Sequence, residues 1–154
     1  MVAYIDGGAR GNPGPAGFGV HVVPEAGAEA TGLYGFLGVA TNNVAEYAAL
    51  LALLEHAVAQ APDQLEVRSD SLLLVRQMIG AYKVRDARLQ VLHAAARRLA
   101  ARLPRVVYAH VPRELNREAD ALANRAMDEQ GSNVPIPSAV TSIPPVVVQP
   151  KLGV

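Results

Sequence analysis

The stretch "YIDGGARGNPGPAG", residues 4–17, passes from a short apolar run to a carboxylate and then to glycine and proline. The apolar run begins at Val2, and it predicts a strand over residues 2–6 that ends on Asp6. The glycine- and proline-rich residues 7–17 predict a tight connection. An aspartate at the end of a strand often serves a turn, so the role of Asp6 has to be decided by the rest of the chain.

The hydrophobic pattern that follows predicts an α/β domain. The expected strands cover residues 18–23, 31–40, 65–70 and 106–111, and the expected helices cover residues 44–60, 71–80, 86–103 and 117–130. Short connections make the first three strands antiparallel neighbours. Helices lead to the fourth and fifth strands, which should therefore lie parallel to the first strand. We expect a five-stranded mixed sheet with helices on both faces.

Composition limits the classes of protein that fit. The chain has 154 residues, of which 51% are hydrophobic and 18% charged, as expected for one globular domain. Its 14 basic and 14 acidic residues give a formal net charge of zero, which argues against a dense basic patch. No cysteine is present, so a metal ion would have to be held by oxygen or imidazole ligands.

The chain carries no sign of a targeting or membrane segment. The start "MVAYIDGG" lacks the basic region and long apolar run of a signal peptide. The most apolar helical stretch, residues 44–61, contains Glu46, Glu55, His56 and Gln60, which indicates a packed helix rather than a membrane span. We expect a cytoplasmic monomer with no membrane partner.

The composition changes after Gln130, which divides the chain into a domain of residues 1–130 and a proline- and valine-rich C-terminal tail of residues 131–154. Five prolines between residues 135 and 150 argue against a helix there. The tail is either a linker or a segment whose valines, Val146 to Val148, form an edge strand or fill an apolar groove of this chain or another copy. The sequence leaves these alternatives open.

Four carboxylates fall at or near the ends of expected elements. Asp6 and Asp70 end two strands that are expected to be parallel, and if these strands are adjacent, both carboxylates lie at one edge of the sheet. Glu46 and Asp120 lie near the starts of two helices, where a negative charge is favourable by itself. Together, four carboxylates would repel one another and raise their pKa values. A divalent cation relieves that repulsion, and oxygen ligands favour magnesium or manganese.

Five motifs in order resemble type 1 ribonuclease H, in its compact bacterial and archaeal form without a basic protrusion or a hybrid-binding module. They are "YIDGGARGNPGPAGFG", "TNNVAEYAALLALL", "VRSDS", "YKVRDARL" and "NREADALAN", and they span about residues 1–129. The resemblance implies a ribonuclease H-like fold. It also implies an endonuclease that hydrolyses the RNA strand of an RNA/DNA hybrid and leaves 3′-hydroxyl and 5′-phosphate ends.

The resemblance assigns the catalytic and metal-binding roles to Asp6, Glu46, Asp70 and Asp120. In such sites two Mg²⁺ ions, about 4 Å apart, clamp the scissile phosphate. Asp6 would bridge both ions, Glu46 and Asp70 would bind one of them, and Asp120 the other. Mn²⁺ is a possible substitute for Mg²⁺.

The resemblance also implies a set of substrate contacts: Gly7, Gly11, Asn12, Thr41, Asn42 and Asn43. Gly7, Gly11 and Asn12 would let the backbone approach the RNA minor groove, where 2′-hydroxyl groups identify RNA. Asn12 and Asn43 would bond to bases or sugars, and Thr41 with Asn42 to a DNA-strand phosphate. Such contacts read shape and sugar, so little base selectivity is expected.

The sequence departs from the family pattern in three places. The usual loop histidine is missing, because His110 falls in an expected strand, and Arg113 or Glu114 is the better candidate for the loop role. Leu72 replaces a common glutamine, and Val44 replaces the usual phosphate-pocket arginine. These changes suggest weaker hybrid binding, for which four basic residues could compensate: Arg76, Lys83, Arg85 and Arg88.

Two alternatives belong to other functional classes. One is a non-catalytic domain that binds hybrids or serves as a scaffold, which the loss of any acid would favour, but all four acids are present. The other is a ribonuclease H-like enzyme that acts on DNA, such as a strand transferase or an exonuclease. The glycine- and asparagine-rich loop and the "TNN" element argue against it.

Overall fold

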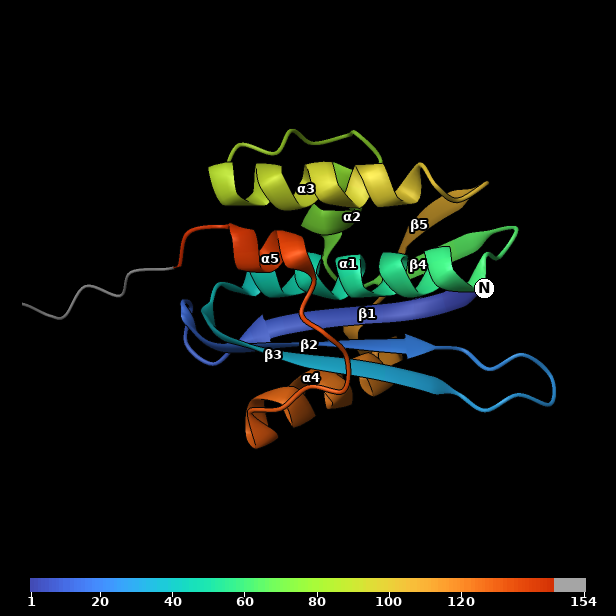
Figure 1. Cartoon of the computed structure of the whole chain (residues 1–154), viewed down its shortest axis with the longest axis horizontal. Helices are drawn as coiled ribbons and strands as arrows, with labels where there is room; N and C mark the ends of the chain where they lie inside the picture. Colours follow the sequence, from blue (N-terminus) through green and yellow to red (C-terminus); the bar gives the residue numbers. More distant parts are fainter. Residues whose placement is uncertain (146–154) are drawn as a thin grey trace, which may run out of the picture.

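The computed structural model describes residues 1–145 and contains one five-stranded sheet in that range. The strands are β1 (Val2–Ala9), β2 (Gly14–Val22), β3 (Thr31–Ala40), β4 (Leu65–Ser69) and β5 (Val106–His110), in the spatial order β3-β2-β1-β4-β5 (Figure 1). β1, β2 and β3 are antiparallel, whereas β4 and β5 are parallel to β1. The predicted mixed sheet is confirmed.

Helices cover both faces of the sheet, as the pattern predicted. They are α1 (Asn42–Gln60), α2 (Leu72–Met78), α3 (Ala87–Ala100), α4 (Arg117–Glu129) and α5 (Ser138–Ser142), with a short 3₁₀ helix, η1 (Arg113–Leu115). α1 lies between the sheet and α3, and α4 lies on the opposite face (Figure 1). Within residues 1–145, no helix combines the length and apolar character needed to cross a bilayer.

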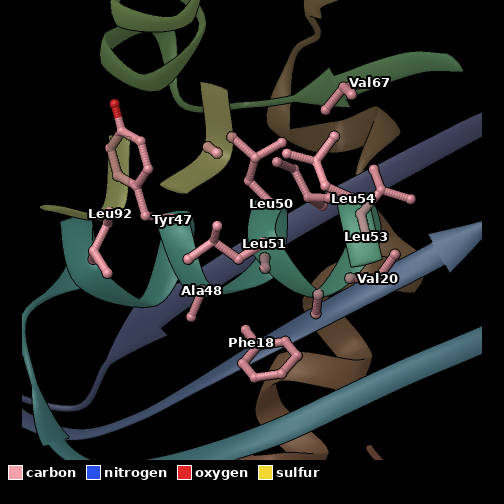
Figure 2. Close-up of a cluster of buried hydrophobic side chains, with 14 of the residues drawn as sticks. Phe18, Val20, Tyr47, Ala48, Leu50, Leu51, Leu53, Leu54, Val67 and Leu92 are labelled. Atoms are coloured by element: carbon pink, nitrogen blue, oxygen red, sulfur yellow. The ribbon is translucent and has the colours of Figure 1, made fainter. Parts of the chain in front are cut away.

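The main core lies between the sheet and α1. Buried residues form an almost continuous row on α1: Ala48 points toward Phe18 of β2, whereas Tyr47 and Leu50 project from the side of the helix away from β2 (Figure 2). α1 begins at Asn42, two residues before the predicted start, because the Thr41 hydroxyl caps it by accepting a hydrogen bond from the Val44 N–H at 3.2 Å. This packing fixes α1, and with it Glu46, against β1.

The prediction that residues 7–17 form only a connection is wrong. β1 continues to Ala9 and β2 begins at Gly14, so the connection covers residues 10–13 alone. Asp6 therefore lies inside β1, paired with Gly19 of β2. However, the parallel pairing of β1 with β4 stops at Ile5 and Ser69. Asp6 is the first residue of β1 beyond that pairing, and it is still at the edge where the prediction placed it.

Helices that pack directly on the strand backbone explain two glycines of the sheet, one in β1 and one in β2. A Cβ at Gly7 would lie 2.3 Å from the carbonyl carbon of Ala45 in α1. A Cβ at Gly19 would lie 2.2 Å from the carbonyl oxygen of Ala119 in α4. Both distances are too short for any side chain, so α1 and α4 can pack this closely only where the strands carry glycine.

The described part of the tail, residues 131–145, runs from the end of α4 past β3 to α5, which packs against α3 (Figure 1). The prediction that its prolines exclude a helix is wrong for α5, because the prolines flank this short helix and leave Ser138–Ser142 free of proline. The expected roles of Val146 to Val148 lie outside the described residues.

Candidate active site

Three of the four predicted acids meet at the edge of the sheet. Asp6 comes from β1, Glu46 lies one turn into α1, and Asp70 directly follows β4. One carboxylate oxygen from each lies within 4.8 Å of the other two. Asp6 and Asp70 are brought together because each follows the last paired residue of adjacent parallel strands. Glu46 joins them because Gly7 admits α1 to the surface of β1.

Asp120 belongs to the same site but comes from the opposite face of the sheet. Asn116, fully buried before α4, donates a hydrogen bond from Nδ2 to the carbonyl oxygen of Ile5 at 2.8 Å. This bond fixes the start of α4 beside β1, and Asp120 follows one turn later. All four acids line one cavity of about 490 Å³, although Asp120 is not part of the close trio.

The site raises the pKa values of two of its own acids. Burial raises the pKa of Asp6 to about 8, helped by the charge of Asp70 and by the neighbouring Asp120. Burial also raises the pKa of Glu46 to about 7, with Asp70 acting in the same direction and a hydrogen bond with Ser71 against it. Charge repulsion and desolvation therefore act together against the ionised site.

The donor set fits a hard divalent cation. Oε2 of Glu46 is buried and has no hydrogen-bond partner in the described residues, which is costly for a carboxylate. Only oxygen atoms converge there, the choice of ligand that Mg²⁺ and Mn²⁺ favour. A cation placed among Asp6, Glu46 and Asp70 would supply the missing partner and the missing positive charge.

Two of the predicted substrate-contact residues, Gly7 and Asn42, line this cavity, and three of the set also hold the structure together. The Asn12 Oδ1 accepts a hydrogen bond from the Asn42 N–H at 3.0 Å, and the Asn42 Oδ1 accepts one from the Ala9 N–H at 2.7 Å. These bonds tie the β1–β2 turn to the start of α1, where Thr41 is the cap. Gly11 and Asn43 are exposed.

The structure distinguishes among the three residues considered for the role of the loop histidine. His110 ends β5 as expected, is exposed, and has Nε2 at 3.3 Å from the Asp70 carbonyl oxygen. Arg113, in η1, lines the acidic cavity. Glu114 also lies in η1 but does not line that cavity.

The four basic residues expected to compensate for weak binding lie on α2, on α3 and on the connection between them. Arg76 stacks over the ring of Tyr82, with its guanidinium carbon 5.1 Å from the ring centroid. Lys83 lines a separate cavity of about 460 Å³. Arg88 donates a hydrogen bond to the Pro145 carbonyl oxygen at 3.3 Å and so contacts the tail. None of the four lines the acidic cavity.

Sequence reasoning missed two residues that build the site, Arg10 and Asn116. Arg10 lines the cavity and its Nη2 donates to Asp128 Oδ1 at 2.6 Å and to Asn124 Oδ1 at 3.3 Å. Arg10 is the only basic residue among the first 67, which was an available signal. Asn116 gave no signal, because its partner is a backbone carbonyl far away in the sequence.

Comparison with known proteins gives a consistent result. Residues 4–126 match the family model described as reverse transcriptase-like. The chain is 45% identical to ribonuclease HI of Halobacterium salinarum over 128 residues, which is 82% of this chain. It is 44% identical to a bifunctional protein of Mycobacterium tuberculosis over 129 residues, which is 83% of this chain. The matched regions span 64% of the halobacterial relative and 35% of the mycobacterial one, less than two thirds in both cases.

The fold also matches solved structures. The structure of LC11-RNase H1 in complex with an RNA/DNA hybrid superposes with a TM-score of 0.76 at 43% identity. The match covers 84% of this chain and 97% of that one.

Proposed function

The chain belongs to the type 1 ribonuclease H family, and from that membership we propose that it is an endonuclease that hydrolyses the RNA strand of RNA/DNA hybrids. The observation that carries the proposal is the meeting of Asp6, Glu46, Asp70 and Asp120 in one cavity beside the β1–β2 turn. The hybrid bound to LC11-RNase H1, a protein 43% identical to this chain, supports the choice of substrate.

Two Mg²⁺ ions are proposed as the cofactor, with Mn²⁺ as a possible substitute. Asp6 would be shared between them, with Glu46 and Asp70 holding one ion and Asp120 the other. The buried oxygen of Glu46 that lacks a partner supports this assignment. When bound, such ions supply an activated water and stabilise charge on the leaving oxygen, which gives 3′-hydroxyl and 5′-phosphate ends.

The β1–β2 turn is proposed to recognise the RNA strand. Gly11 and Asn12 lie on the turn, and the bond from the Asn42 N–H to Asn12 holds it at a fixed place beside the cavity. A turn fixed in this way is preorganised to meet the 2′-hydroxyl groups. Gly7 would contribute indirectly, because its missing side chain admits α1 and Glu46.

Residues near the cavity are also proposed to bind the DNA strand of the hybrid and to take the role of the loop histidine. Thr41 and Asn42 at the start of α1 are proposed to hold a DNA-strand phosphate, and Asn43, which is exposed, to contact a base or sugar. Arg113 is proposed for the role of the loop histidine, because it lines the acidic cavity.

We also propose, from the sequence, a cytoplasmic monomer in which residues 1–130 form the catalytic domain and residues 131–154 the tail. The whole protein's activity and partners are proposals of the same kind, since the chain spans only 64% of the halobacterial relative and 35% of the mycobacterial one.

The test uses labelled RNA/DNA, DNA/DNA and RNA/RNA duplexes with Mg²⁺. We expect cleavage of the RNA strand of the hybrid alone. Asp70→Asn should lower that cleavage by at least about a hundredfold, because it removes a metal ligand. Asp63→Asn is the matched control, since Asp63 is exposed in the loop before β4 and should keep full activity.

Three results would contradict the proposal. Cleavage of DNA/DNA would point to another ribonuclease H-like nuclease, and binding of hybrid without cleavage would point to a non-catalytic hybrid-binding domain. Full hybrid cleavage by the Asp70→Asn variant would show that the acidic cavity is not the active site.

A further inference from the structure

Arg10 lines the acidic cavity, although the stability of the fold does not depend on its positive charge. Two residues that line this cavity are basic, Arg10 from the β1–β2 turn and Arg113 from η1. The Arg10 guanidinium contacts Asp128 and Asn124 of α4 through Nη2. This contact joins the β1–β2 turn to α4 across the cavity. Arg10 could therefore either stabilise the fold or bind a ligand.

The fold does not depend on that bridge. The side chains of Arg10 and Asp128 are 48% and 64% exposed, and an ion pair this exposed to water contributes little to stability. α4 is already fixed by its close packing on Gly19 and by the buried bond from Asn116 to Ile5. The turn is fixed independently by the bond from the Asn42 N–H to the Asn12 side chain.

The charge of Arg10 does match the proposed substrate. Four carboxylates line the cavity and repel a phosphodiester backbone. Metal ions offset this repulsion only near the scissile phosphate, so the neighbouring phosphates need cations from the protein. Arg10 directly precedes Gly11 and Asn12, the turn residues proposed to read the RNA strand. Its planar guanidinium is suited to bidentate phosphate contacts.

We propose that Arg10 binds a backbone phosphate of the RNA strand next to the scissile phosphate. In the free protein Asp128 holds the guanidinium at the cavity, and on binding the phosphate replaces Asp128 as its partner. The exchange is easy because the ion pair is exposed. The proposal rests on the proposed function and adds a substrate contact to it.

The first test compares Arg10→Ala with Arg105→Ala in hybrid hydrolysis. Arg105 is an exposed arginine that precedes β5, at the end of that strand away from the acids, so it controls for the loss of one positive charge. Arg10→Ala should lower kcat/KM about tenfold, the size expected for a hydrogen bond to a charged group, with the change mainly in KM. Its plot of log kcat/KM against log salt should be shallower by about one unit.

The second test separates phosphate binding from a structural bridge. Asp128→Asn also breaks the ion pair but frees Arg10 for the substrate, so KM should stay the same or fall. Glu129→Gln controls for the loss of one negative charge on α4, because Glu129 pairs with Arg125 instead. If Asp128→Asn raises KM as much as Arg10→Ala, the bridge positions the turn and the proposal is wrong.

The proposal is also wrong if Arg10→Ala and Arg105→Ala behave alike while the unmodified protein cleaves the hybrid. If the unmodified protein does not cleave the hybrid at all, the proposed function itself fails. The two failures are therefore distinguishable by the activity of the unmodified protein.

Discussion

The carboxylate of Glu46 costs the folded protein free energy. The side chain is half-buried near Asp6 and Asp70, and its Oε2 is buried with no hydrogen-bond partner in the described residues. A buried carboxylate in this state either takes up a proton or binds a cation. The raised pKa values of Glu46 and Asp6 reflect the first outcome, and the proposed metal ions provide the second.

Metal-free protein should therefore become less stable as the pH rises. The pKa values of Asp6 and Glu46 rise on folding from 3.8 and 4.5 to about 8 and about 7, so between these limits the folded state binds more protons than the unfolded state. The free energy of unfolding then falls with increasing pH across this window. In EDTA, Tm should fall between about pH 5 and about pH 9, and Mg²⁺ should raise Tm more at the higher pH.

Glu46→Gln is the matched variant for this measurement. The amide keeps the shape of the side chain but cannot ionise, so metal-free Tm should depend less on pH and Mg²⁺ should raise it less. An unchanged pH dependence in this variant, measured by the same thermal scans, would show that Glu46 does not titrate in the folded protein.

At the scale of elements, the β1–β2 hairpin differs most from what the sequence indicates. Local rules assign glycine to turns, but Gly7 and Gly17, which were expected in the connection, lie in β1 and β2, where helices from elsewhere in the chain pack on them. Such contacts join residues far apart in sequence, and composition gives no sign of them. The same reason explains why Asn116, which bonds to the backbone of β1, was not predicted.

The elements with local signals were predicted well. α1 carries a capping threonine, and α3 carries Asp86 as its cap and apolar residues at helical spacing. The antiparallel and parallel strand directions followed from the lengths of the connections. The four acids were predictable because each stands at or near an element end within a motif, whereas the partner of Arg10 on α4, Asp128, lies 118 residues further along the chain.

Gly19→Ala tests the close packing of α4 on β2. The new Cβ would meet the Ala119 carbonyl oxygen at 2.2 Å and the Ala123 nitrogen at 2.7 Å, so α4 must move away. We expect a loss of about 2 kcal/mol in the free energy of unfolding. The rate of hybrid cleavage, measured at a temperature where the variant is still folded, should also decrease, because a shift of α4 displaces Asp120.

Gly131→Ala is the control for this variant, since its new Cβ would lie 3.7 Å or more from its nearest neighbours. Its stability should change by less than about 0.5 kcal/mol in urea denaturation. Equal unfolding midpoints for the two variants would mean that α4 adjusts to the extra methyl group without cost.

At the scale of the whole molecule, residues 131–145 link the two layers of helices. The segment leaves α4 on one face of the sheet and reaches α5 on the other (Figure 1). On the way, Asn133 accepts a hydrogen bond from the Tyr34 N–H at 2.7 Å and donates one to the Gly32 carbonyl at 2.8 Å. Tyr34 and Gly32 belong to β3, an edge strand, so the segment covers backbone groups that could pair with another chain.

Ending the chain after Gln130 should destabilise the domain without removing its chemistry. Ile136, Val140 and Ile143 are partly buried against the core, and losing about 1 kcal/mol for each would lower the free energy of unfolding by about 3 kcal/mol. For a chain of this size, Tm should fall by about 10 °C. All four acids precede the cut, so hybrid cleavage should persist well below the new Tm.

A second chain that ends after Pro145 separates the described tail from residues 146–154. If both shortened chains melt at the same temperature, residues 131–145 contribute nothing to stability, whatever their contacts. If only the shorter chain melts early, the covering of β3 and the packing of α5 account for the loss. Size-exclusion chromatography at increasing concentration then tests the edge, because an uncovered β3 should make the shorter chain associate. Association of both shortened chains to the same extent would contradict the protective role of residues 131–145.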